Sequence, residues 1–520
     1  MSSWLRMLAA YIGSIFFSLF IGTLAATSEV RGRILLPLLD ILQSVPVLGF
    51  FPTAVAWFMG NSGHRFGIEM AAIFLIFTSQ SWNLAFGVYD GIKSVPTETK
   101  EALLSLGLGP LALFRRLYVP AVFPRVIDNS VLSWSNGWYF LMACEIISLG
   151  PREFRLPGLG SYLSYSIEHA LWLNMVFGIS ALILLIVAMD VFIWKPLNAL
   201  CTQFRFESTK QESGDASNTG LYVLTLYRNH RIFVPLRLFL SLCYEIWVSV
   251  ESKLEKPTEK GFRPATGWKW ANLGSLSLLW GGLVAGSIYA TLALISSLVP
   301  PYDIAPWRIF ESVLLSSLRI AAAYIVSLMW ILPLVYWINQ SPAITRQFKS
   351  LAQILSSIPA TAFFPLIAIL ALKLFGLTEV AVLLLLVTGM QWYLLFNVLG
   401  GATSIPNDIR EATTSLGVKK QLYIRKVFLP SIVPALVTGS ITAVGGGWNA
   451  LIISEYFKSS GSTYTVFGVG SILAKATYES GNERLMALTL FVMVAFILFL
   501  NRFLWQRLYK WSEHKFKLEG

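Results

Sequence analysis

The sequence has little charge, few cysteines and few histidines. Charged residues make up 13% of the 520-residue chain, about half of their share in ordinary globular proteins. The three cysteines, Cys144, Cys201 and Cys243, lack the spacing of metal ligands, so they indicate neither a zinc site nor a disulfide framework. No GxxxxGK-type phosphate loop is present, and no Ser/His/Asp or Cys/His set falls on a plausible common surface. We therefore expect no metal site, no ATP bound by such a loop and no catalysis by this chain.

What the chain has in quantity is apolar length. Hydrophobic residues make up 55% of it, and apolar runs of about 18 or more residues, enough to cross a bilayer core, recur along it. The net charge of +12 fits cytoplasmic loops rich in Lys and Arg better than a nucleic-acid surface. The sequence predicts an all-α polytopic membrane protein with about eleven transmembrane helices, at 5–26, 34–59, 66–90, 126–148, 171–195, 275–298, 308–336, 350–375, 379–400, 435–456 and 483–505.

The second half of the chain repeats the first in the same order. Self-similarity of this kind is a primary signal of fold. Matching segments are 5–14 and 318–327, 41–52 and 354–365, 94–107 and 404–417, and 158–163 and 468–473. The repeat predicts a first unit at 1–195 with five spans, a polar cytoplasmic linker at 196–270 and a second unit at 271–520 with six spans. The two units are expected to lie parallel in the membrane.

Two segments have more than one interpretation. Residues 5–26 combine Arg6, an apolar run and the small residues Ala25 and Ala26, as a signal peptide would. Their counterpart deep in the second half favours a helix that is retained. Residues 232–250 of the linker are almost long enough to span, but a span there would invert the second repeat. We therefore predict an interfacial amphipathic helix.

One charged loop occurs twice between the apolar segments. The first copy runs from Glu101-Ala102 to Gly107 and is followed by Pro120. The second runs from Glu411-Ala412 to Gly417 and is followed by Pro430 at the same distance. Both are rich in Lys and Arg after the glycine, which indicates the cytoplasmic side. Each is predicted to be a helix–turn–helix that a partner protein grips.

Two glutamates fall inside predicted spans. Glu145 and Glu455 follow Trp138 and Trp448 by two helical turns, so each pair shares a helix face. A carboxylate at membrane depth is costly and normally faces a cavity or a partner. Two roles remain open: lining or gating a translocation path, and bonding to neighbouring helix ends to hold the bundle together. Direct anion binding is disfavoured unless the acid is protonated or paired.

Amide and aromatic side chains form a second candidate set. Such groups inside a bundle can bind a polar solute in transit or bond across helices, and packing is the commoner role for any one of them. The Ser-x-Pro sequences at 44–46 and 357–359 are expected to kink or interrupt helices. The Gly-x-Gly sequences at 158–160 and 468–470 are expected to turn short surface helices. The candidate set comprises Gln80, Trp82, Asn136, Gln391, Trp392 and Asn449.

The doubled loop resembles the "EAA" loop of the inner-membrane permeases of ABC importers. In that family the loop forms a coupling helix that docks into a groove on the ATPase subunit. Both copies here keep the Glu, Gly and Pro positions and depart at the third residue, Leu103 and Thr413. The segment 447–455 and the Gly-x-Gly sequences are similar to nitrate/sulfonate/bicarbonate (taurine-type) permeases, and in particular to duplicated forms that fuse two copies. The resemblance covers nearly all of the chain except 196–270.

The resemblance implies two tandem parallel type I importer permease repeats. They would form the whole path for a small anion that an extracytoplasmic substrate-binding protein delivers. Two cytoplasmic ATPase subunits would carry ATP and Mg, with no cofactor on this chain and no nucleic-acid partner. The location would be a prokaryotic inner membrane, with the N-terminus outside and the C-terminus cytoplasmic. The alternatives are a fused ferric-iron or thiamine-type permease and an ion-coupled secondary transporter, although repeats in the latter are often inverted.

Overall fold

The computed structural model describes two large parts of the chain. These are 2–201, without 63, 107–109, 150–151 and 170, and 304–516, without 460–461. Positions 220–223, 225, 245 and 249 are described in isolation. The predicted span 275–298, Gly107 and most of the linker, including nearly all of the predicted interfacial helix 232–250, lie outside the described residues.

The first repeat consists of helices, with π-helical segments (η) and one strand hairpin. α1 packs against α4, and α4 packs against α7, so these three form its centre. Its elements are α1 Ser2–Ala26, α2 Glu29–Ser44, α3 Val47–Ser62, α4 His64–Lys93, α5 Thr97–Ser105, α6 Pro110–Leu113, η1 Phe114–Tyr118, α7 Val119–Cys144, β1 Ile146–Leu149, β2 Arg152–Arg155, α8 Leu159–Glu168, α9 Trp172–Met189, η2 Asp190–Trp194 and α10 Lys195–Cys201.

The second repeat has the same order of elements, with one added π-helical segment, η5. α14 packs against α17, and α17 against α20, as in the first centre. Its elements are α14 Pro306–Ile338, α15 Pro342–Ser357, α16 Ala360–Phe375, α17 Thr378–Thr403, α18 Asn407–Ser415, α19 Lys420–Tyr423, η4 Ile424–Phe428, α20 Leu429–Ser454, β3 Tyr456–Ser459, β4 Ser462–Thr465, α21 Val469–Lys475, η5 Ala476–Ser480, α22 Glu483–Leu500, η6 Asn501–Trp505 and α23 Gln506–Phe516.

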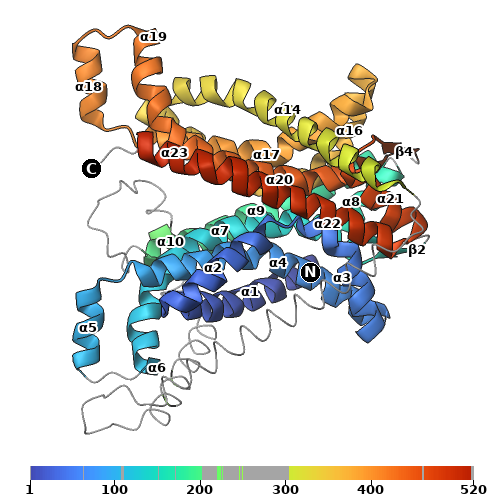
Figure 1. Cartoon of the computed structure of the whole chain (residues 1–520), viewed down its shortest axis with the longest axis horizontal. Coiled ribbons are helices and arrows are strands. Elements are labelled where there is room, and N and C mark those ends of the chain that lie inside the picture. Colours follow the sequence, from blue (N-terminus) through green and yellow to red (C-terminus); the bar gives the residue numbers. More distant parts are fainter. Residues whose placement is uncertain are drawn as a thin grey trace.

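The two repeats lie parallel, as the sequence predicts. In Figure 1 both charged hairpins, α5–α6 and α18–α19, project from one end of the molecule, and both strand hairpins lie at the other end. We call these the loop end and the hairpin end. Within the described residues, seven helical stretches are long and apolar enough to cross a membrane. They are Ser2–Ala26, Phe66–Lys93, Trp172–Cys201, Pro306–Ile338, Thr378–Thr403, Lys420–Ser454 and Arg484–Phe516.

Two predicted spans, 34–59 and 350–375, are wrong as single helices. Each is broken before a proline, between α2 and α3 at Val45 and between α15 and α16 at Ile358, where the backbone is extended. The ring of a following proline disfavours the helical conformation in the preceding residue. The four helices have 16 residues each, about 24 Å of helix, which is shorter than a bilayer core. The predicted interruption at the Ser-x-Pro sequences is therefore confirmed.

The broken helices connect the two repeats. α3 packs against α20 and α22 of the second repeat, and α16 packs against α7 and α8 of the first. Two hydrogen bonds also join the repeats. Tyr393 Oη of α17 donates to Asn136 Oδ1 of α7 at 2.8 Å, and Thr361 Oγ1 of α16 donates to the Tyr139 carbonyl of α7 at 3.3 Å. α3 and α16 thus pack on their own repeats and also contact the other repeat.

Candidate functional site

The doubled loops have the predicted helix–turn–helix form. α5 and α18 are helices of nine residues, and the side chains of Glu101, Ala102, Glu411 and Ala412 on them are exposed. The apolar residue that ends each helix is even more open: Leu106 is 75% exposed and its counterpart Leu416 is 80% exposed. An acidic and apolar surface repeated at one end of the molecule is typical of a docking surface.

Local backbone structure explains why glycine stands at position 417 and proline at the two loop positions. Gly417 ends α18 in the left-handed region at φ 63°, where its own amide bonds to Thr414 and the next amide bonds to Thr413. This is the usual glycine end of a helix. Pro120 and Pro430 occupy the first turns of α7 and α20, directly after η1 and η4. Proline cannot donate an amide hydrogen bond. In both repeats, the helix is π-helical in the five residues that end just before the turn with the proline.

In the second loop, an arginine anchors the helix α18. Arg410, at the middle of α18, donates to the Asn339 carbonyl at 3.1 Å, to Asn339 Oδ1 at 3.2 Å and to the Ala402 carbonyl at 2.8 Å. It therefore ties α18 to the ends of α14 and α17. By the repeat, the first loop has Lys100 at the position of Arg410. The shorter head group of lysine does not have the fork geometry for such a set of bonds.

Replacing Arg410 by alanine is expected to loosen α18 without unfolding the chain. Three hydrogen bonds from one charged group are lost, and such bonds each contribute about 1.5–3 kcal/mol or less. Hydrogen exchange of the α18 amides should accelerate about tenfold or more, while α5 exchanges as before. Lys100→Ala is the matched control in the first loop. An equal effect of the two substitutions would contradict the anchoring role.

At the opposite end, each buried glutamate lies in a compact polar cluster that we call a carboxylate node. The first node joins Ser3 and Arg6 of α1, Glu69 of α4, Glu145 after α7 and Gly160 of α8. Glu145 Oε1 accepts from Ser3 Oγ at 2.5 Å and from Arg6 Nη1 at 2.9 Å, and Oε2 accepts from the Gly160 amide at 2.5 Å. Arg6 binds the Glu69 carboxylate through Nε and Nη2 at 2.5 and 2.8 Å.

The second node repeats this arrangement group for group. Glu455 Oε1 accepts from Ser316 Oγ and from Arg319 Nη1, both at 2.7 Å, and Oε2 accepts from the Gly470 amide at 2.8 Å. Arg319 binds Glu379 through two bonds of 2.7 Å. In both nodes the arginine also donates to a backbone carbonyl, that of Pro157 or Phe467. The nodes therefore reproduce the internal duplication at the level of single hydrogen bonds.

Burial makes the central glutamates dependent on their partners. Glu145 and Glu455 are 0% exposed, whereas the outer acids Glu69 and Glu379 are 36% and 59% exposed. A buried carboxylate is stable only when it is paired and its oxygens accept hydrogen bonds. In each node, the arginine guanidinium pairs with the carboxylate, and the arginine, the serine hydroxyl and a backbone amide donate hydrogen bonds to its oxygens. The amide belongs to the first turn of α8 or α21, and the positive end of that helix favours the negative charge.

The Gly-x-Gly sequences complete the nodes. The second glycine, Gly160 or Gly470, donates its amide to the carboxylate. The first, Gly158 or Gly468, makes room, since a Cβ atom at either position would overlap the glutamate carboxylate. The predicted short helices α8 and α21 do begin here. The strand hairpins β1–β2 and β3–β4, which the sequence did not predict, bring the chain from each glutamate back to this point.

Replacing Gly468 by alanine is expected to destabilise the protein. The added methyl group must displace the Glu455 carboxylate or the start of α21, and overpacking of this kind costs about 1–3 kcal/mol. The measurement is the thermal unfolding of the purified chain in detergent. Gly445→Ala on α20 is the control, because nothing lies within 4 Å of a Cβ atom there and alanine favours a helix. Equal melting temperatures for the two variants would contradict the packing role of Gly468.

The amide and aromatic candidates are not gathered in one place. Gln80 and Trp138 are buried in the first repeat, where Gln80 Nε2 lies 3.7 Å from Met7 Sδ. Trp448 is buried in the second repeat with its ring edge against Phe496, the two centroids lying 6.2 Å apart. Half-buried members are Trp82, Gln391, Trp392 and Asn449. Asn136 lies between the repeats, bonded to Tyr393. A path role for these residues remains a prediction.

The sequence contains a signal for the nodes. Arg6 and Arg319 are equivalent charged residues in apolar spans, and Glu69 and Glu379 are equivalent acids at the starts of the spans that pack against them. Charges of both signs that recur at equivalent depths of both repeats indicate an ion pair. Tyr393 and Arg410, which join separate helices, also escaped sequence reasoning.

A comparison with known families agrees with this architecture. The family model of the binding-protein-dependent transport system inner membrane component matches residues 18–193 and again residues 331–518. The chain belongs to this family. It is a membrane permease with two copies of the family's unit in one polypeptide, as the resemblance implied. The two matches together cover more than half of the chain and contain both loops and both buried glutamates.

Named relatives are similar over part of their length. The chain is 24% identical over 145 residues to the nitrate import permease protein NrtB of Leptolyngbya laminosa, covering 28% of this chain and 50% of that one. It is 25% identical over 142 residues to the bicarbonate transport system permease protein CmpB of a Synechocystis species, covering 27% and 46%. It is 26% identical over 174 residues to the taurine transport system permease protein TauC of Escherichia coli K12, and the match covers 32% of this chain and 59% of that one. The chain thus spans about half the length of these relatives.

Proposed function

We propose that this permease forms the whole translocation path of an ATP-driven importer for a small anion. The observation that carries the proposal is the pair of equivalent exposed helices, α5 and α18, at one end of a duplicated permease. Each would dock on one ATPase subunit, and an extracytoplasmic binding protein would deliver the solute. ATP and Mg would be held by the ATPase subunits, with no cofactor on this chain. Nitrate, bicarbonate and taurine, named for the relatives, define the class of solute.

The orientation follows from charge. The loop end carries the basic residues Arg115 and Arg116 in η1, after α5 and α6, and Lys419 and Lys420 after α18. Lys and Arg mark cytoplasmic loops. With this end inside, α1 begins outside and α23 ends at the cytoplasmic face (Figure 1). The proposed units remain 1–195, 196–270 and 271–520, the middle one being a cytoplasmic linker.

The carboxylate nodes suit a mechanism of rigid movement. Closure of two ATPase subunits would draw α5 and α18 together and rock the repeats into an outward-open state. Rocking needs stiff units. Each node fastens α1, α4, α7 and α8, or their counterparts, at the hairpin end, about one bilayer away from the loop that is moved. Of the two roles open for Glu145 and Glu455, the geometry favours holding the bundle together. The amide and aromatic candidates would line or support the path between the nodes and the loops.

The function is tested by reconstituting the chain with its ATPase subunits and binding protein in proteoliposomes. The binding protein is supplied empty or loaded with nitrate, bicarbonate or taurine. We expect one loaded form to stimulate ATP hydrolysis and uptake about tenfold, a normal size for coupling between sites. Hydrolysis that is the same with loaded, empty and absent binding protein would contradict the proposal.

A further inference from the structure

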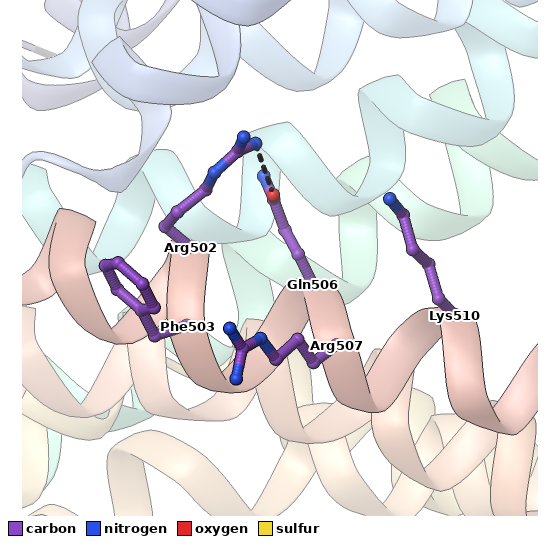
Figure 2. Close-up of a pocket in the computed structure, with 5 residues that line it drawn as sticks. All are labelled: Arg502, Phe503, Gln506, Arg507 and Lys510. Carbon is purple, nitrogen blue, oxygen red and sulfur yellow. Dashed lines mark hydrogen bonds between the residues drawn. The ribbon is translucent and has the colours of Figure 1, made fainter.

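The last helix of the second repeat carries a cationic hollow. Five residues of η6 and α23 line an open hollow of about 430 Å³. The lining residues are Arg502, Phe503, Gln506, Arg507 and Lys510. In Figure 2, Arg502, Gln506 and Lys510 project from the same side of the helix, one turn apart. Arg502 Nη1 donates to Gln506 Oε1 at 3.0 Å, so Gln506 orients the guanidinium.

The two repeats can be aligned here through their π-helical segments. η2, Asp190–Trp194, is followed by Lys195, and η6, Asn501–Trp505, is followed by Gln506. In the first repeat, Lys195 is neutralised by Asp190 at 3.2 Å. In the second, the position of that acid is Asn501. The second repeat thus has Arg502, Arg507 and Lys510 where the first has Val191, Pro196 and Ala199, and it has an amide in place of the acid.

Among the described side chains, the cations of the hollow form no salt bridge with an acid. Arg507 lies over the Phe503 ring, with its guanidinium carbon 5.7 Å from the ring centroid, and neither Arg502 nor Lys510 forms a salt bridge with a described residue. Three cations within about 12 Å of helix repel one another, and an anion between them removes that cost. Arginine head groups match the planar or trigonal edges of oxyanions.

We infer that Arg502, Arg507 and Lys510 form a binding site for a small oxyanion at the loop end of the second repeat. Gln506 adds a neutral hydrogen-bonding group, and Phe503 holds Arg507 in place. Under the proposed orientation the site faces the cytoplasm, where imported anions would be released. The oxyanion chemistry is shared by a free solute anion and by the phosphate of a lipid headgroup, and the experiment separates the two. The choice of nitrate as a probe rests on the proposed function.

The test uses the full chain in nanodiscs of phosphatidylcholine. Sodium nitrate or sodium sulfate replaces sodium chloride at constant ionic strength, and the melting temperature is followed as a function of the anion concentration, which gives an apparent Kd. The variants are Asn501→Asp, which restores the acid of the first repeat, and Arg502→Gln. Arg33→Gln is the control, because Arg33 is 80% exposed and forms only a surface pair with Glu29. Sulfate also stabilises proteins through exclusion from their surface, so the difference between variants is the measured quantity.

We expect the apparent Kd to rise about tenfold in Asn501→Asp and Arg502→Gln and to stay unchanged in Arg33→Gln. A second possible result identifies a lipid source: free anions have no effect, but phosphatidylglycerol in the nanodisc raises the melting temperature of the unmodified chain and not of the two variants. The inference is overturned if neither anions nor phosphatidylglycerol distinguish the unmodified chain from Arg502→Gln. The measurement contains no ATPase, so its failure leaves the proposed coupling untouched, and failed coupling leaves this binding result standing.

Discussion

Replacing Glu455 by alanine is expected to lower the free energy of unfolding by about 3–5 kcal/mol. The substitution removes the acceptor for Ser316, Arg319 and the Gly470 amide at once. Arg319 is 14% exposed and keeps only its bonds to the exposed Glu379, while the Ser316 hydroxyl and the Gly470 amide lose their acceptor. Removing one partner of a buried pair is the costly case. Chemical or thermal unfolding of the purified chain in detergent measures the loss. Glu145→Ala should have an effect of similar size, because its node makes the same bonds.

Two further variants decide whether the loss comes from the buried charge. Glu379→Gln changes the outer partner of Arg319. Because Glu379 is 59% exposed and exposed pairs contribute about 0–1 kcal/mol, this variant should lose little stability. The double variant Arg319→Met with Glu455→Leu removes both charges, and apolar replacement of a buried pair is often close to neutral. It should recover much of the stability lost in Glu455→Ala. If Glu455→Ala has the same melting temperature as the unmodified chain, the node does not hold the bundle together.

The repeat allowed the loop end to be predicted in detail. Glu101 and Glu411 follow apolar spans at equivalent positions, and the glycine and proline spacing in each copy predicted a helix–turn–helix before any contact was known. The same reasoning predicted breaks at Pro46 and Pro359. These features are local, so that the residues that decide them lie within a few positions of one another.

The hairpin end was less predictable because its contacts are long-range. Ser3 and Glu145, or Arg319 and Glu455, are joined only when three helices have packed, and a single sequence shows the charges without their pairing. The four-residue strands were missed for a related reason. Ile146–Leu149 is an apolar run continuous with α7, so it was counted as part of the span 126–148.

Exchanging Glu101 and Glu411 for arginine is expected to uncouple the permease from its ATPase subunits. Both side chains are exposed on short helices next to open leucines, so the folded chain should tolerate the change. At a docking surface the same change places two cations where the partner accommodates acids. Disrupting a desolvated charge pair at an interface costs about 2–5 kcal/mol, which is about thirtyfold or more in affinity for each loop. ATPase subunits should fail to copurify, and solute-stimulated hydrolysis should be lost.

The matched control reverses two other exposed acids, Glu29 on α2 and Glu311 on α14, which changes the net charge by the same amount. The single variants Glu101→Arg and Glu411→Arg separate the two loops. Arg410 anchors α18, and the equivalent position of α5 holds Lys100. We therefore expect the second loop to be the stiffer lever, so that its reversal reduces hydrolysis more than reversal of the first. ATPase subunits that copurify with the double variant and still hydrolyse ATP in response to solute would remove the coupling role from both helices.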